Sequence, residues 1–152
     1  GAVRHFWAAD FGAFPGGGAR VAENVFARNG GKRDMTEESK RRLVEAGIDV
    51  DDALARLMQN EGLLMRLLRA FLQDANFARL QEALAKGDVS GAFTAAHTLK
   101  GVAGNLSMKD LFARVSEVVE CLRGGDIGAA AEKMPAVEAS YRKVADALSA
   151  EG

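Results

Sequence analysis

The sequence has few of the residues that build disulfide frameworks and zinc sites. It contains one cysteine, Cys121, and two histidines, His5 and His97. A single cysteine excludes an internal disulfide and is typical of a protein from a reducing compartment. Because two histidines and one cysteine fall short of the ligand set of a structural zinc site, we expect neither a metal nor a cofactor.

The sequence also lacks a long apolar run and a strong charge of either sign. No segment approaches the roughly 20 apolar residues that span a bilayer, and the N-terminus has no signal-peptide pattern. The formal net charge is -1 and the pI is near 6.2, which gives no electrostatic reason to bind nucleic acid or an acidic membrane surface. We therefore expect a cytoplasmic protein that binds neither membranes nor nucleic acid.

The composition changes near residue 35. Residues 1–34 hold a large share of the 17 glycines, including three in succession at 16–18. Glycine this dense opposes both helix and strand. We interpret 1–34 as a Gly-rich N-terminal extension, either a linker or the remnant of a tag. We expect one domain over residues 35–152, long enough to bury a core without disulfides or metals.

From Met35 onward, apolar residues recur at spacings of three and four, which is typical of amphipathic helices. The pattern predicts helices over about 36–45, 49–59, 60–86, 89–106, 109–122 and 127–148. Two short segments, Gly87-Asp88 and 124–126, have a glycine to end one helix and an aspartate to cap the next. Long helices joined by short turns predict an all-α fold. We expect an antiparallel up-down-up-down four-helix bundle with a short N-terminal lead-in helix.

The helix expected at 89–106 carries the most informative pattern. At about 100° of rotation per residue, six small and apolar residues form one stripe, which must face the core. The stripe consists of Val89, Ala92, Ala96, Leu99, Ala103 and Leu106. His97 lies roughly 130° from the centre of this stripe, on the outside of the bundle.

Three neighbours of His97 are unusual as a set. Gly101 and Gly104 lie on the same outer strip, although glycine inside a helix costs about 1 kcal/mol relative to alanine at each position. They leave the imidazole on a low surface that is open to another protein, and Lys100 brings an ammonium group towards it. Singly, these features also fit a solvated histidine, a close helix contact and a surface lysine. Together they favour a nucleophilic imidazole beside a cation that offsets phosphoryl charge.

The segment 97–106, HTLKGVAGNL, resembles the HxLKGxxxNLG signature of histidine phosphotransfer (Hpt) domains. It matches at the histidine, both leucines, the lysine, the first glycine and the asparagine. Ser107 stands where that family commonly has glycine. The expected order of helices and Gly-Asp turns is also similar, and the resemblance covers roughly residues 45–150.

The resemblance implies a role for each matched residue. His97 would be the phosphoacceptor, Lys100 would stabilise phosphoryl charge, Gly101 would keep the surface clear, and Asn105 would shape the end of the helix. Members of this family are carriers without kinase activity, and the receiver domain contributes the aspartate and Mg²⁺. The implied partners are response-regulator receiver domains and a hybrid sensor histidine kinase, which a monomer would meet in turn.

We expect five residues to form the receiver docking surface around His97. They are Gly101, Gly104, Phe93, Phe77 and Met108. Two other functions remain open at this point. One is a helical adaptor that binds receiver domains without being phosphorylated. The other is the phosphotransfer module of a chemotaxis-type histidine kinase, cut from a longer chain.

Overall fold

The computed structural model describes residues 35–150, and these residues form seven α-helices. The helices are α3 (Glu37–Glu45), α4 (Val50–Arg56), α5 (Glu61–Phe71), α6 (Asn76–Lys86), α7 (Val89–Asn105), α8 (Lys109–Arg123) and α9 (Ile127–Ser149). Over this range there is no strand, only one isolated bridge between Ile48 and Met108. The all-α prediction is confirmed here, whereas the interpretation of 1–34 concerns residues outside those described.

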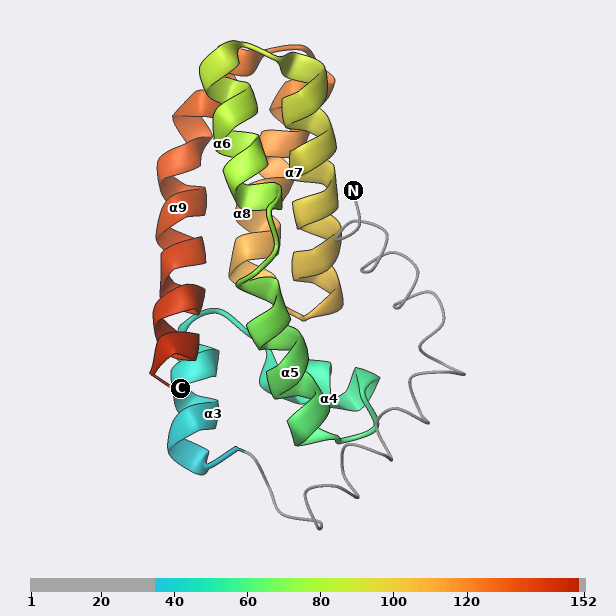
Figure 1. Ribbon diagram of the computed structural model, residues 1–152, viewed down its shortest axis with the longest axis vertical. Coiled ribbons are helices and arrows are strands. Elements are labelled where there is room, and N and C mark those ends of the chain that lie inside the picture. Colours follow the sequence, from blue (N-terminus) through green and yellow to red (C-terminus); the bar gives the residue numbers. More distant parts are fainter. Residues whose placement is uncertain (1–34, 151–152) are drawn as a thin grey trace.

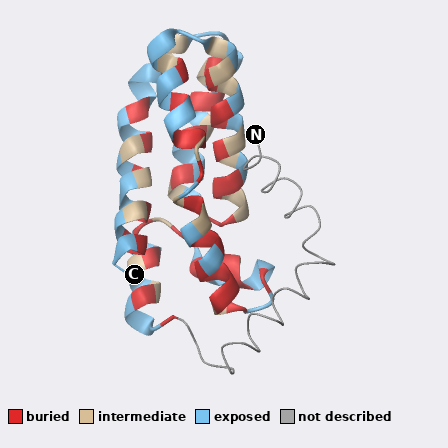
Figure 2. Cartoon of the chain, in the orientation of Figure 1, coloured by how far each residue is buried: buried red, intermediate tan, exposed pale blue. Residues whose placement is uncertain are grey.

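Helices α6 to α9 form a bundle in which each helix packs against the next along the chain. They stand side by side in Figure 1, with α9 and α7 at the two sides of the view. Their inner faces are buried, as Figure 2 shows. The predicted stripe on α7 faces this core: Ala92, Ala96, Leu99 and Ala103 are fully buried, and Leu106 is almost so.

The two predicted turns have the expected capping. Gly87 ends α6 with a φ of 73°, a left-handed conformation that glycine adopts without the Cβ penalty. The Asp88 side chain accepts a hydrogen bond from the backbone nitrogen of Gly91 at 2.9 Å. Asp126 does the same for Ala129 at the start of α9. Side-chain caps of this kind satisfy backbone donors that the first helical turn leaves open.

The continuous helix predicted over 60–86 is wrong, because α5 ends at Phe71 and α6 begins at Asn76. Asp74 explains part of the break. Its Oδ1 accepts hydrogen bonds from the backbone nitrogen and from Nδ2 of Asn76, both at 2.7 Å. An aspartate that bonds to a nearby backbone donor in this way competes with helical pairing. The apolar periodicity continues through the break, so the pattern did not reveal it.

Helices α3, α4 and α5 lie beyond one end of the bundle, near the ends of α7 and α9 (Figure 1). Ser107, in the turn between α7 and α8, connects the bundle to this lead-in. Its Oγ donates to Oδ2 of Asp52 at 2.6 Å, and its carbonyl accepts from the backbone nitrogen of Asp49 at 2.8 Å. These two hydrogen bonds fasten the lead-in helices, α3 to α5, to the end of the helix that carries His97.

Candidate functional site

His97 lies on the outer face of α7, exposed to solvent. The buried stripe faces the other way, so the packing of α7 alone turns the imidazole outward. One helical turn earlier, the half-buried Phe93 ring stacks on the imidazole, with 5.7 Å between ring centroids and 29° between planes. This contact restricts the orientation of the imidazole while leaving the ring accessible.

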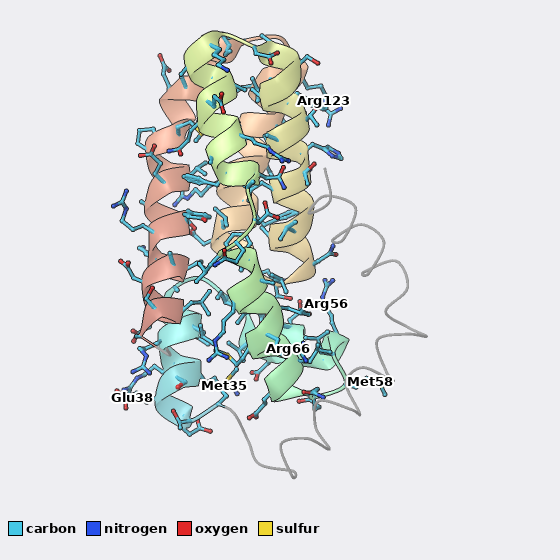
Figure 3. All side chains as sticks on the ribbon, viewed as in Figure 1. Met35, Glu38, Arg56, Met58, Arg66 and Arg123 are labelled. Atoms are coloured by element: carbon cyan, nitrogen blue, oxygen red, sulfur yellow. The ribbon has the colours of Figure 1, made fainter. Side chains whose placement is uncertain are left out.

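Arg123, the last residue of α8, lies over the Phe93 ring. Its guanidinium carbon is 5.3 Å from the ring centroid, within the range of a cation–π contact. Figure 3 shows Arg123 at the end of the bundle near the α7–α8 side. Its Nε also pairs with Oε2 of Glu120 at 3.4 Å, and both side chains are more than half exposed. Phe93 thus contacts both the imidazole of His97 and a cation from the next helix.

Lys100 lies on the other side of His97 along the same helix. Its Nζ is 5.6 Å from the centroid of the Phe112 ring, which belongs to α8 and is 37% exposed. The contact keeps the ammonium group on the outer face of α7, one turn beyond the imidazole. On this strip, therefore, each of two cations lies over an aromatic ring: Arg123 over Phe93 and Lys100 over Phe112.

The two glycines of the strip differ in their surroundings. A Cβ atom at Gly101 would meet no other atom within 4 Å, whereas one at Gly104 would lie 3.1 Å from Cδ2 and Cε2 of Phe112. Gly104 therefore makes room for an aromatic ring within the chain. Gly101 serves no packing contact of this kind, although alanine would make the helix about 1 kcal/mol more stable.

Two residues assigned to the docking surface do not lie on it. Phe77 is 7% exposed and packs edge-on against Tyr141 of α9, with ring centroids 4.0 Å apart. Met108 is completely buried at the start of α8. Both predictions are wrong for the same reason: apolar side chains at these positions fill the core. Asn105 is the last residue of α7, at the end of the helix as expected.

Sequence reasoning missed Arg123 and Phe112, although a usable signal was present. Helices α7 and α8 run antiparallel from the turn at Met108, so residues at equal distances from it along the chain meet. Phe93 and Arg123 form one such pair. Gly104 and Phe112 form another. Pairing residues at equal distances before and after Met108 would have predicted both contacts from the sequence.

The arrangement is suited to a nucleophile that works on a partner's substrate. The exposed imidazole stacks on Phe93, whose ring also contacts Arg123, and it has Lys100 on the next helical turn and a clear surface at Gly101. Residues 35–150 contain no group of three or more His, Cys, Asp or Glu side chains that could hold a metal ion. In the same range, no helix is both long and apolar enough to cross a membrane.

Comparison with known families assigns the chain. The model of the Hpt domain family matches residues 66–149, more than half of the chain. The chain therefore belongs to the Hpt domain family, whose members carry phosphoryl groups in two-component phosphorelays and work with receiver and kinase domains. Comparisons with curated proteins and with solved structures give no match.

Proposed function

We propose that this chain is a phosphorelay intermediate that carries its phosphoryl group on His97. The group comes from the aspartate of a receiver domain, or from a kinase, and passes to a response regulator. The observation that carries this proposal is the exposed His97 imidazole, stacked on Phe93 beside the uncovered backbone of Gly101. Membership in the Hpt family supplies the chemistry that such a site performs.

Transfer from the aspartyl phosphate to His97 needs no further reactant. The lone pair of an unprotonated imidazole nitrogen forms a bond to phosphorus. The bond between phosphorus and the aspartyl oxygen of the partner breaks, and the carboxylate leaves with its electron pair. The second ring nitrogen keeps its proton. Because the acyl phosphate and the phosphohistidine are both energy-rich, the step is near-reversible, and the receiver contributes Mg²⁺.

Within this proposal, Lys100 offsets the negative charge that arrives on His97. The partner docks on the strip formed by Phe93, Gly101 and Gly104, and we add Phe112 because more than a third of its surface is exposed there. The chain acts as a monomeric carrier without kinase activity of its own.

We assign the functional domain to residues 35–152 and propose the up-down-up-down order for α6 to α9, which the short turns at 87–88 and 124–126 support. The lead-in helices belong to the domain, because they hold the turn after α7 through Ser107.

The test is incubation with a phosphorylated receiver domain and Mg²⁺. We compare the wild type with His97→Gln, and we use His5→Gln as the matched control because His5 is the only other histidine. We expect acid-labile, base-stable label on the wild type and on the control, and none on His97→Gln.

A panel of receivers that phosphorylates a known carrier but leaves this chain unlabelled would overturn the proposal. If those receivers bind without transferring the group, the chain is an adaptor. Circular dichroism of His97→Gln separates loss of the nucleophile from loss of the fold, because an exposed side chain contributes little to stability.

A further inference from the structure

An open cavity of about 540 Å³ lies between α6 and α9, away from the His97 strip. This volume falls within the range of small-molecule sites in proteins. Nine residues line the cavity: Leu72, Asp74, Phe77, Ala78, Gln81, Glu138, Tyr141, Arg142 and Ala145. None of them lies on α7 or α8, so the cavity shares no residue with the phosphotransfer site.

Asp74 is the polar residue that needs explanation in this cavity. It is 7% exposed, and its Oδ1 is occupied by the two hydrogen bonds from Asn76. Its Oδ2 is buried and has no hydrogen-bond partner among the described residues. A buried carboxylate oxygen without a donor is costly, because the oxygen loses its hydration without replacement. A positive charge beside the carboxylate would offset part of this cost.

Aromatic rings form the apolar wall of the cavity. Tyr141 packs edge-on against Phe77 at 4.0 Å between centroids and lies 5.5 Å from Phe71. Burial raises the pKa of the Tyr141 phenol, and the negative charge of Asp74 raises it further. The phenol and the carboxylate both belong to residues that line the cavity. A ligand at Asp74 would meet both a carboxylate and aromatic surface, a combination that attracts organic cations.

The remaining charges of the cavity favour the same sign of ligand. Glu138 adds a second carboxylate, whose Oε1 accepts a hydrogen bond from Nε2 of Gln81 at 3.1 Å. Arg142 is the single basic residue of the lining, and it is exposed. The lining therefore carries a net negative charge, which disfavours an anion.

We propose that this cavity binds a small organic cation: a guanidinium or primary ammonium group on a short aliphatic stem. The positive charge of the head offsets the negative charge of the Asp74 carboxylate, and the stem packs against the rings of Phe77 and Tyr141. The proposal does not rest on phosphotransfer by His97, since different helices form the two sites.

The test uses n-butylguanidinium as the probe and neutral n-butylurea as its isostere, titrated into the full chain and followed by NMR. Tyr141 is the only tyrosine, so its ring signals report on this cavity alone. We expect saturable shifts of these signals with the cation and none with the urea. Asp74→Asn keeps an acceptor for Asn76 but removes the charge, and we expect at least about tenfold weaker binding.

Two variants keep the test decisive. Glu132→Gln, on the exposed side of α9, changes the net charge equally but should leave the affinity unchanged. Ala145→Leu fills the cavity without altering Asp74 and should also abolish binding. The cation could be a free small molecule or the side chain of a protein, and an N-acetylated arginine amide distinguishes the two. Tighter binding of this amide than of n-butylguanidinium would assign the cation to a protein side chain.

Four results would overturn the proposal. The first is no saturable binding to the wild type. The second is equal affinity for the cation and the urea, which would mean that the cavity recognises only the apolar stem. The third is unchanged affinity in Asp74→Asn. Binding that appears only in Arg142→Gln would also overturn it, because Arg142 itself would then be the cation of this cavity.

Discussion

The α7–α8 side and the α6–α9 side of the bundle both carry aromatic rings next to charged groups, but with opposite exposure and sign. On the first side, Phe112 is 37% exposed and lies beneath the ammonium group of Lys100. On the second, Phe77 is 7% exposed and packs near the buried carboxylate of Asp74. The first side thus carries cations at its surface, whereas the second encloses a carboxylate.

The difference teaches that an aromatic residue near a helix terminus does not by itself mark a docking surface. Phe77 and Phe93 both appear in sequence as apolar residues within reach of His97. Phe93 stacks on the imidazole, whereas Phe77 turns towards Tyr141. What separates them is the neighbouring helix, because α8 leaves the outer strip of α7 open and α9 covers Phe77.

The largest effect on stability should come from truncating the buried ring. We expect Phe77→Ala to lower the free energy of unfolding by about 3–5 kcal/mol, through lost burial and the cavity left at Tyr141. The partly exposed ring serves as the matched control, and we expect Phe112→Ala to lower it by less than about 1 kcal/mol. Urea unfolding followed by circular dichroism measures both.

Equal losses from the two substitutions would contradict the contrast between the two sides. If Phe77→Ala does not fold, Phe77→Leu gives a smaller cavity and keeps the comparison measurable. For phosphotransfer we expect the opposite order: Phe112→Ala should slow transfer more than a folded Phe77 variant does, because Phe112 borders the proposed docking strip and Phe77 does not.

A smaller effect, on transfer alone, should come from Gly101→Leu. We expect transfer from a receiver to slow by about tenfold or more, since about 1.4 kcal/mol of lost docking is tenfold and an added side chain obstructs close approach. Stability should not fall, because a Cβ at Gly101 meets no atom within 4 Å and leucine favours helix more than glycine does.

Gly128→Leu on α9 is the control for this prediction. Gly128 is exposed and lies on a different helix from His97, so the same substitution there should leave transfer unchanged. An unaltered transfer rate in Gly101→Leu would mean that the partner does not approach this part of α7.

Much of this fold was predictable from sequence because its signals are local. Glycine and aspartate mark the turns between helices, and the apolar stripe of α7 places His97 outside. The break at 72–75 was missed because the apolar periodicity continues through it, whereas the two hydrogen bonds from Asn76 to Asp74 that help to cause it do not alter the pattern. The contacts of Arg123 and Phe112, and the burial of Met108, depend on how helices pair. One helix read alone does not contain that information.

The smallest effect should arise at Ser107, where the Hpt signature commonly has glycine. Ser107 adopts a φ of 55°, a left-handed conformation that costs a non-glycine residue roughly 1–2 kcal/mol. The hydrogen bond from its Oγ to Asp52 offsets this cost. We expect Ser107→Ala to be less stable than the wild type, because it keeps the strained backbone and loses the bond. The stability of Ser107→Gly should lie between that of the wild type and that of Ser107→Ala, because glycine loses the hydrogen bond but adopts the left-handed conformation without strain.

The pH dependence distinguishes this hydrogen bond from simple packing. The bond from Ser107 is the main cause that holds the pKa of Asp52 below its ordinary value of 3.8, with Lys109 and Arg56 adding to it. A lowered folded-state pKa contributes stability above the ordinary pKa, and that stability is lost as the pH falls through the folded-state pKa. The difference in Tm between wild type and Ser107→Ala should therefore be greatest near neutral pH and shrink below 3.8.

Ser116→Ala is the control, because it removes a hydroxyl bonded to a carbonyl rather than to a carboxylate, so its effect on Tm should not change with pH. A difference for Ser107→Ala that is equally independent of pH would assign the role of Ser107 to packing alone.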